Sequence, residues 1–497
     1  GRSMNHQRRH GLPRDRDLFV LAASLLIAGF AVAGGHDAGP PGRLFLVWIA
    51  VSTAALLFAP LAARYSNRRF PDPLWIIAAL HLVYFVLRAA GLQYAGNYTH
   101  FALESEQAFG AYGETVLRLV ALAGCAIYWG TLIPQPRRLL SSALQSVTRP
   151  VESNDIQSWL LMGLVGVLFR LGLDFYNGVW QFGLESSIGL VFFLVMDAGL
   201  EATVAAYTFA TKPVHKTCAT VLLVGIFVSL YFFNFKEPLI MMLLLLLAGR
   251  VMLQRRVPWM AITCAALFTL FVVFPLVEGR RDAVLRGEDF RMEHFTAHLT
   301  GGTPVEGPVD LAARTAGQVL ARFHGADSFA IVLNRVPDEI PHPGVSSTLS
   351  RLAISFLPRF LFPDKPLIHQ GFVFNEIFFG RATESVSIAT FQIVEAYYLA
   401  GIAGTVVIAI FMGWVGSLVG YVRSQISSPL IFPYFCVCVR ALMNTERDIV
   451  LVWTTLLRAL LVFWFLHSAL NYLKIGSSVL CVASQGIPIK TPHGAEG

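Results

Sequence analysis

The chain has 497 residues, of which 55% are hydrophobic and only 14% are charged, and its formal net charge is +7. A soluble protein of this length could not bury so much apolar surface, so the composition indicates a polytopic membrane protein. The basic excess alone would suit a nucleic-acid partner. The arginines and lysines instead stand in short clusters between apolar runs, where membrane topology places them. We therefore expect an all-α membrane protein that binds no nucleic acid.

The first apolar run covers residues 18–34 and follows a basic segment. Residues 1–3 precede Met4 and resemble an expression remnant, and Ala31-Val-Ala33 resembles a signal-peptidase site, so a cleaved signal is one alternative. The favoured interpretation is an uncleaved first helix with its basic flank in the cytoplasm. Eleven later runs could also cross a core of about 30 Å, which predicts about twelve transmembrane helices in total. These runs lie at 43–63, 74–91, 115–133, 157–173, 187–210, 217–234, 237–253, 258–277, 394–422, 429–445 and 449–473.

Basic clusters follow the even-numbered spans, and short basic loops face the cytoplasm. Both termini are therefore expected in the cytoplasm, and the polar interval 278–392, between spans nine and ten, on the opposite side. The predicted organisation is nine spans over residues 1–277, an external loop with amphipathic helices over 278–392, three spans over 393–474 and a cytoplasmic tail over 475–497. The basic residues concerned are Arg64, Arg68, Arg69, Arg137, Arg138, Arg149, Lys212, Lys216, Arg250, Arg255, Arg256 and Arg423.

Two amphipathic helices are predicted in the external loop, within 309–335 and 349–362. In the first, Arg314, Gln318 and Arg322 recur every fourth residue and form a polar stripe opposite apolar side chains. Helices of this kind lie along lipid headgroups or cap a cavity.

Ionisable residues inside predicted spans are costly, so they face a partner or a wet cavity. Asp197 and Glu201 lie one turn apart on span six, while Arg440 and Arg458 lie on spans eleven and twelve. One interpretation is an Asp197–Arg458 ion pair that holds two helices together. The other is that the arginines line an outward-facing polar cavity. The structural role is favoured for Asp197 and the cavity for Arg440.

Metal and nucleotide motifs are missing from the sequence. The six cysteines fall inside predicted spans or in the tail, so no external disulfide is expected, and Cys436-x-Cys438 has the wrong spacing for zinc. Neither a phosphate-binding glycine loop nor an H-E-x-x-H helix occurs. The sequence therefore predicts no metal site and no cofactor.

A proline-rich turn and the span after it carry a family resemblance. Pro358-Arg359 and Pro363-Asp364-Lys365-Pro366 are followed about thirty residues later by Glu395-Ala-Tyr397-Tyr398-Leu-Ala-Gly401-Ile-Ala-Gly404. The prolines force a stiff, charged turn. Together with the layout of spans, this pattern resembles the oligosaccharide repeat unit polymerases, the Wzy-type O-antigen polymerases, to which the O-antigen ligases are related. The sequence departs from that pattern at Val394, where the family often has glycine.

The resemblance implies a GT-C-like fold and an inverting, metal-independent glycosyltransferase. Such an enzyme polymerises polyprenyl-pyrophosphate-linked oligosaccharide repeat units at the periplasmic face of a bacterial inner membrane. The lipid-linked oligosaccharide, membrane lipids and, optionally, a chain-length regulator are its expected partners. A glycan ligase that shares this chemistry and a flippase or transporter of the same lipid are the alternatives. Transporters usually have related halves, whereas the polar residues here form one asymmetric loop.

Transfer from a lipid pyrophosphate builds negative charge on phosphate oxygens, which arginine forks bind well. The acceptor hydroxyl needs an oriented base, and the candidates are Glu395 and His324, which lies one turn before Asp327. A single histidine on an amphipathic helix more often serves packing than catalysis. The residues expected to bind pyrophosphate or glycan are Arg359, Lys365, Arg322, Arg314, Arg280, Arg281, Arg440 and Tyr398.

Overall fold

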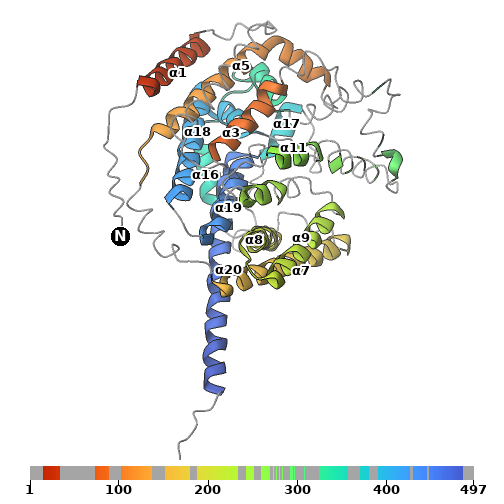
Figure 1. Ribbon diagram of the computed structural model, residues 1–497. Helices are drawn as coiled ribbons and strands as arrows, with labels where there is room; N and C mark the ends of the chain where they lie inside the picture. Colours follow the sequence, from red (N-terminus) through yellow and green to blue (C-terminus); the bar gives the residue numbers. More distant parts are fainter. Residues whose placement is uncertain are drawn as a thin grey trace, which may run out of the picture.

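The computed structural model is helical throughout the residues that it describes (Figure 1). These residues are 15–33, 73–88, 102–136, 152–179, 187–232, 242–250, 259–268, 324–355, 370–379, 390–425, 429–444 and 447–484, with a few short pieces between 272 and 307.

Most of these helices fall where the sequence predicts apolar spans or amphipathic segments. The sequence did not predict the helix Gln370–Phe379, and the helix Ala102–Leu132 begins before the predicted span 115–133. Before the predicted external loop the helices are α1 (Asp15–Ala33), α3 (Pro73–His81) continued by the π-helical η1 (Leu82–Leu87), α5 (Ala102–Leu132), α7 (Ser153–Val179), α8 (Ser187–Phe209), α9 (Pro213–Phe232) and α11 (Trp259–Phe268). The later ones are α15 (Gly325–Arg335), α16 (Val345–Ser355), α17 (Gln370–Phe379), α18 (Gln392–Gln425), the 3-10 turn η3 (Pro429–Ile431), α19 (Phe432–Met443) and α20 (Ile449–Ser484).

Four of the described helices contain a stretch that is long and apolar enough to cross a membrane. These stretches are Ala108–Leu132, Ser153–Gly172, Gln392–Tyr421 and Ile449–Leu470. Shorter apolar helices accompany them at Val20–Gly29, Ile76–Val86, Pro213–Val228 and Phe432–Met443. The chain is therefore a helical membrane protein.

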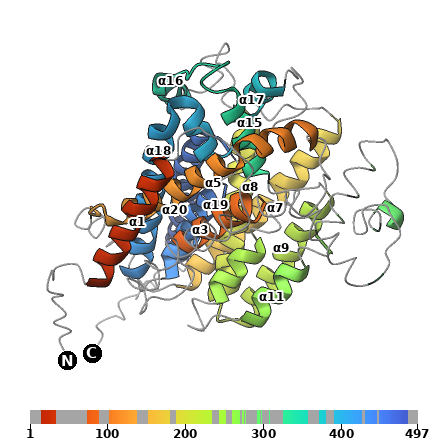
Figure 2. The same cartoon turned by 90° about the horizontal axis from the view of Figure 1, so that it is seen from above.

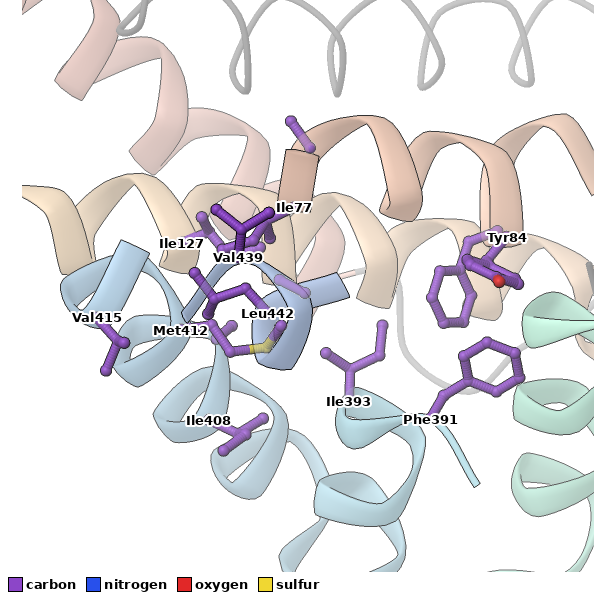
Figure 3. Packing of buried hydrophobic residues seen from close by; sticks show 14 of the residues in the cluster. Ile77, Tyr84, Ile127, Phe391, Ile393, Ile408, Met412, Val415, Val439 and Leu442 are labelled. Atoms are coloured by element: carbon purple, nitrogen blue, oxygen red, sulfur yellow. The ribbon is translucent and has the colours of Figure 1, made fainter. Parts of the chain in front are cut away.

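Helix α5 forms the centre of the bundle and packs along α18, α15 and α1. Residues 119–128 of α5 are all buried. Figure 3 shows how Ile127 of α5 meets Met412 of α18 and Val439 of α19 in the apolar core. Close packing of these apolar side chains fixes the positions of the helices that carry the polar site.

Glycines allow two pairs of helices to approach unusually closely. A Cβ atom on Gly413 of α18 would collide with the carbonyl oxygen of Ile127, and one on Gly130 of α5 with that of Ile410. Helices α7 and α8 cross at Gly166 and Gly199, where a Cβ on either would lie less than 3 Å from the other's Cα. Small residues at crossings of this kind are typical of membrane helices, because the backbones gain van der Waals contact.

Helix α18 is broken near its start. Gly401 has a positive φ of 61° and Ala400 a φ of −152°, so the helix bends sharply there. The hydroxyl of Thr405 consequently donates to the carbonyl of Ile393 at 3.4 Å, although these residues would stand about 18 Å apart in a straight helix. Residues 392–399 thus fold back onto the next turns, and the predicted single span 394–422 is two segments. Glycine at position 401 permits this bend.

Helix α15 also differs from the prediction. It was expected on the membrane surface, but residues 325–333 are all buried and pack along α5. Gly325 allows the close approach, because a Cβ there would lie 3.0 Å from Cε1 of Phe85. In Figure 2 α15, α16 and α17 gather along one side of the bundle.

The last helix is longer than expected. Helix α20 continues to Ser484, through the first part of the predicted cytoplasmic tail, and projects beyond the other helices in Figure 1. Pro488 is the first proline after Ile449, so nothing stops the helix at the end of the predicted span.

Candidate functional site

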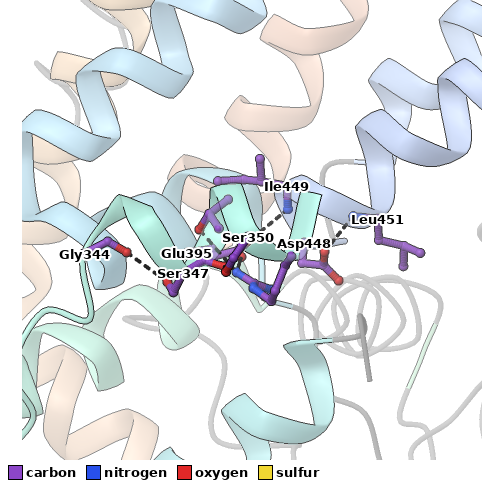
Figure 4. A network of polar contacts seen from close by, with 9 residues as sticks. Gly344, Ser347, Ser350, Glu395, Asp448, Ile449 and Leu451 are labelled. Carbon is purple, nitrogen blue, oxygen red and sulfur yellow. Dashed lines mark hydrogen bonds and ion pairs between the residues drawn. The ribbon is translucent and has the colours of Figure 1, made fainter. Parts of the chain in front are cut away.

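Glu395 lies in the first turn of α18 and is the centre of a buried polar network (Figure 4). Its side chain is only 1% exposed. Arg351 Nη2 donates to Oε1 at 2.9 Å, and the backbone N–H of Ile449 donates to Oε2 at 2.6 Å. Each carboxylate oxygen therefore has its own donor, one of them charged, which fixes the orientation of the group.

Arg351 reaches Glu395 from α16, which lies in the polar interval 278–392. Its side chain is 12% exposed and also donates to Thr348 Oγ1 at 3.3 Å, one turn earlier on the same helix. At the start of α16 Gly344 has a φ of +83°, and the Ser347 hydroxyl donates to its carbonyl at 2.9 Å. The turn before α16 thus sets the direction of the helix and the reach of its arginine.

The N-terminus of α20 supplies the second donor. Asp448 caps this helix, because its Oδ1 accepts a hydrogen bond from the N–H of Leu451 at 2.7 Å. The neighbouring N–H of Ile449 remains for Glu395. A helix N-terminus favours negative charge, so α20 attracts the carboxylates of both Asp448 and Glu395, although the two like charges repel each other.

The break in α18 connects the site to the segment before α16. Because the helix stops at Ala400, the carbonyls of Tyr398 and Leu399 are freed from regular helical bonding. The Tyr398 carbonyl lies 2.9 Å from Nδ1 of His342, and the Leu399 carbonyl accepts from the N–H of Gly344 at 3.0 Å. These two bonds connect the segment before α16, the helix of Arg351, to the first part of α18, which carries Glu395.

The other end of α16 is attached to α20. Arg458 donates to the carbonyl oxygen of Ser355, the last residue of α16. The predicted ion pair between Asp197 and Arg458 is therefore wrong, because Arg458 binds α16 and Asp197 binds Arg440. The sequence could not decide which of the two arginines faces α8.

Two further predicted site residues lie close to this network. The buried ring of Tyr398 packs edge-on against Phe378 of α17. The positive charge of Arg351 interacts electrostatically with the Tyr398 hydroxyl group. His324 immediately precedes α15, and its ring centroid is 6.0 Å from that of Phe391. Phe391 lies one turn before Glu395, so His324 adjoins the site through an aromatic ring.

Asp327, one turn after His324, forms a buried ion pair. Arg88 Nε donates to its Oδ2 at 3.0 Å, with both side chains less than 10% exposed. Burial raises the pKa of Asp327 above its ordinary value, and the charge of Arg88 acts in the opposite direction. This pair anchors α15 to the helix that precedes α5.

Arg440 lies away from Glu395, on the face of α19 that meets α8. It donates to Asp197 through Nη2 and to Glu201 Oε1 through Nη1 at 3.4 Å. The remaining predicted binding residues lie outside the described part of the chain. They are Arg280, Arg281, Arg314, Arg322, Arg359 and Lys365, and the proline-rich turn belongs with them.

The sequence did not single out Arg351 or Asp448 as site residues. Asp448 had a recognisable signal, since an aspartate directly before an apolar run is typical of a helix N-cap. Arg351 had a weaker signal, because the polar interval 278–392 contains many arginines and the sequence does not show which residue each one binds.

The fold and this network define a helical membrane protein with a buried, positioned carboxylate at the meeting of three helices. The matching family is described as "Domain of unknown function (DUF8712)" and covers residues 77–427. The chain belongs to this family. The matched region includes Arg351 and Glu395 but ends before α19 and α20. No curated protein matches the chain, and neither does any solved structure.

Proposed function

We propose that this protein is an inverting, metal-independent glycosyltransferase that polymerises polyprenyl-pyrophosphate-linked oligosaccharide repeat units. The observation that carries the proposal is the geometry of Glu395. Its carboxylate is buried, accepts one hydrogen bond at each oxygen, and lies beneath α16 of the external loop. A general base for a sugar hydroxyl needs this kind of fixed orientation.

In the proposed reaction, an acceptor hydroxyl oxygen attacks the anomeric carbon of the lipid-linked donor. The bond between that carbon and the pyrophosphate oxygen breaks on the opposite face, so the configuration inverts. Glu395 takes the hydroxyl proton, and the polyprenyl pyrophosphate leaves with the bonding electrons. Negative charge that develops on the phosphate oxygens is stabilised by arginines, among which Arg359 of the proline-rich turn is the leading candidate.

Arg351 has two roles in this proposal. Without substrate it covers Glu395 and neutralises its charge. A pyrophosphate anion competes for the same guanidinium, and its greater charge draws Arg351 away from the carboxylate. Donor binding thus uncovers the base at the moment when an acceptor can use it. A base that stays covered until the donor arrives is also unavailable to remove a proton from water.

The finer topology belongs to the same proposal. We place about twelve spans in a bacterial inner membrane, with residues 278–392 in the periplasm and both termini in the cytoplasm. Cysteine introduced at Gly302 should react with an impermeant thiol reagent in intact spheroplasts, whereas cysteine at Ser141 should react only after lysis. The reverse pattern would contradict this topology.

The activity is tested with purified protein in detergent and the lipid-linked repeat unit as sole substrate. We expect longer lipid-linked chains, formed without nucleotide, without a membrane gradient and in the presence of a chelator. Transfer only to a different acceptor, such as lipid A, would identify a ligase. Movement of the donor across liposome bilayers without elongation would identify a flippase.

Arg359 is tested separately, because it carries the proposed contact with pyrophosphate. Arg359→Ala should abolish polymer while the protein remains folded in the membrane. Arg359→Lys should restore little, since a point charge cannot bind two oxygens as a fork does. Long chains from the alanine variant would limit the proline-arginine turn to a structural role.

A further inference from the structure

A second buried group of charges lies between α8 and α19, away from Glu395. Asp197 and Glu201 stand one turn apart on α8 and share Arg440 of α19. The side chain of Glu201 is 2% exposed, compared with 14% for Arg440 and 19% for Asp197. Glu201 Oε2 is buried and accepts no hydrogen bond within the described part of the chain.

The three groups do not balance if both acids are ionised. Two carboxylates and one guanidinium would leave a negative charge in an apolar setting, with like charges one turn apart. Arg440 makes its closer contact with Asp197, while its bond to Glu201 is long at 3.4 Å. The charge of Arg440 therefore compensates mainly that of Asp197. A negative charge on Glu201 would lack full compensation.

The surroundings of Glu201 supply no second cation among the described residues that act on it. The charges that influence it are those of Arg440 and Asp197. The thiols of Cys436 and Cys438, also on α19, face it as well. Helix α7 crosses α8 where Gly166 meets Gly199, and Arg170 of α7 lies one turn beyond that crossing. On α20, Arg458 binds the carbonyl of Ser355.

We propose that Glu201 is a proton-binding site, which holds a neutral carboxylic acid while Asp197 carries the charge that pairs with Arg440. If Glu201 is neutral, the oxygen that lacks a hydrogen-bond donor is uncharged. Burying that oxygen costs far less free energy than burying a carboxylate oxygen that accepts no hydrogen bond. The site is independent of the proposed glycosyl transfer. It makes the packing of α8 against α19 dependent on one bound proton.

The proton has a predictable effect on stability. The folded protein holds a proton at Glu201 that the unfolded chain has lost at neutral pH. Stability therefore falls as pH rises above the ordinary range of a glutamate, by about tenfold in the folding equilibrium per pH unit from this group. Glu201→Gln, the neutral isostere, should remove that slope and fold at least as well as the wild type.

Infrared difference spectroscopy of the purified protein tests the proposal directly. The wild type at neutral pH should show a protonated-carboxyl band that Glu201→Gln lacks. Asp197→Asn should also lose it, because Glu201 then ionises to pair with Arg440. Glu339→Gln is the matched control, since Glu339 is exposed in an ion pair with Arg335, and it should change no such band.

Three results would overturn the proposal. The first is a spectrum in which Glu201→Gln removes an ionised-carboxylate band instead. The second is a protonated band that Glu201→Gln leaves unchanged. The third is a Glu201→Gln protein that fails to fold while Asp197→Asn folds, because it would mean that the charge at position 201 is required.

Discussion

Two of the buried sites in the described chain where arginine meets carboxylate, those around Glu395 and Arg440, differ in their stoichiometry. At Glu395 one acid receives a guanidinium and a backbone N–H, so both oxygens have donors. At Arg440 one guanidinium serves two acids, and one oxygen of Glu201 has no donor within the described chain. The first arrangement suits one carboxylate, and the second suits one carboxylate beside one protonated acid.

The difference also lies in the elements that form each site. Glu395 is contacted by α16, from the predicted external loop, and by the N-terminus of α20. The Arg440 group instead joins the two apolar helices α8 and α19. An arginine that comes from a loop helix can move toward a substrate without opening the bundle. An arginine between two spans cannot do so without separating them. Substitutions at the two sites should therefore differ in their effects on stability.

The largest effect on stability is expected from Arg440→Ala. It leaves the Asp197 charge buried without its cation, which costs about 3–5 kcal/mol. Arg440→Lys should recover part of this loss. Thermal or denaturant unfolding in detergent measures both. A loss below about 1 kcal/mol for the alanine variant would contradict the assignment of a charged Asp197–Arg440 pair.

A smaller loss is expected from Arg351→Ala. Glu395 keeps the N–H of Ile449 and the favourable end of α20, so the cost should be about 1–3 kcal/mol. Arg335→Ala is the matched control, because its ion pair with Glu339 spans 3.9 Å near the surface, and it should lose no more than about 1 kcal/mol. Equal losses for Arg351→Ala and Arg440→Ala would remove the distinction between the sites.

The smallest of these effects concerns the cap of α20. Asp448→Ala removes the hydrogen bond to Leu451, and loss of such a cap costs about 0.5–2 kcal/mol. Asp448→Asn should retain most of that stability, since asparagine also caps helices. If the asparagine variant lost as much as the alanine variant, the charge of Asp448 would matter more than its hydrogen bond.

The sequence predicted the helices better than their arrangement. Apolar runs of sufficient length locate α5, α7, α18 and α20, because the thickness of the membrane imposes the length. The resemblance also brought Glu395 forward as a catalytic candidate, and the structure gives it an oriented setting. Its role in catalysis stays a prediction.

The sequence could not predict which residues of this chain pair with each other across the helix bundle. The bend at Gly401 depends on the backbone angles of Ala400 and Gly401, and glycine is common in membrane helices that do not bend. Helix α15 is held by the Arg88–Asp327 pair, whose members lie 239 residues apart. Hydropathy would equally allow Asp197 to pair with Arg458, and the relative rotation of α8, α19 and α20 decides for Arg440.

The central claim is that Glu395, oriented by Arg351 and Ile449, accepts the proton of the acceptor hydroxyl. It is tested most directly by single-turnover elongation with purified protein saturated with the lipid-linked repeat unit. Glu395→Gln should bind the donor as the wild type does but elongate about 10²–10⁴-fold more slowly, while Glu339→Gln keeps the wild-type rate. Elongation by Glu395→Gln at the wild-type rate would contradict the claim.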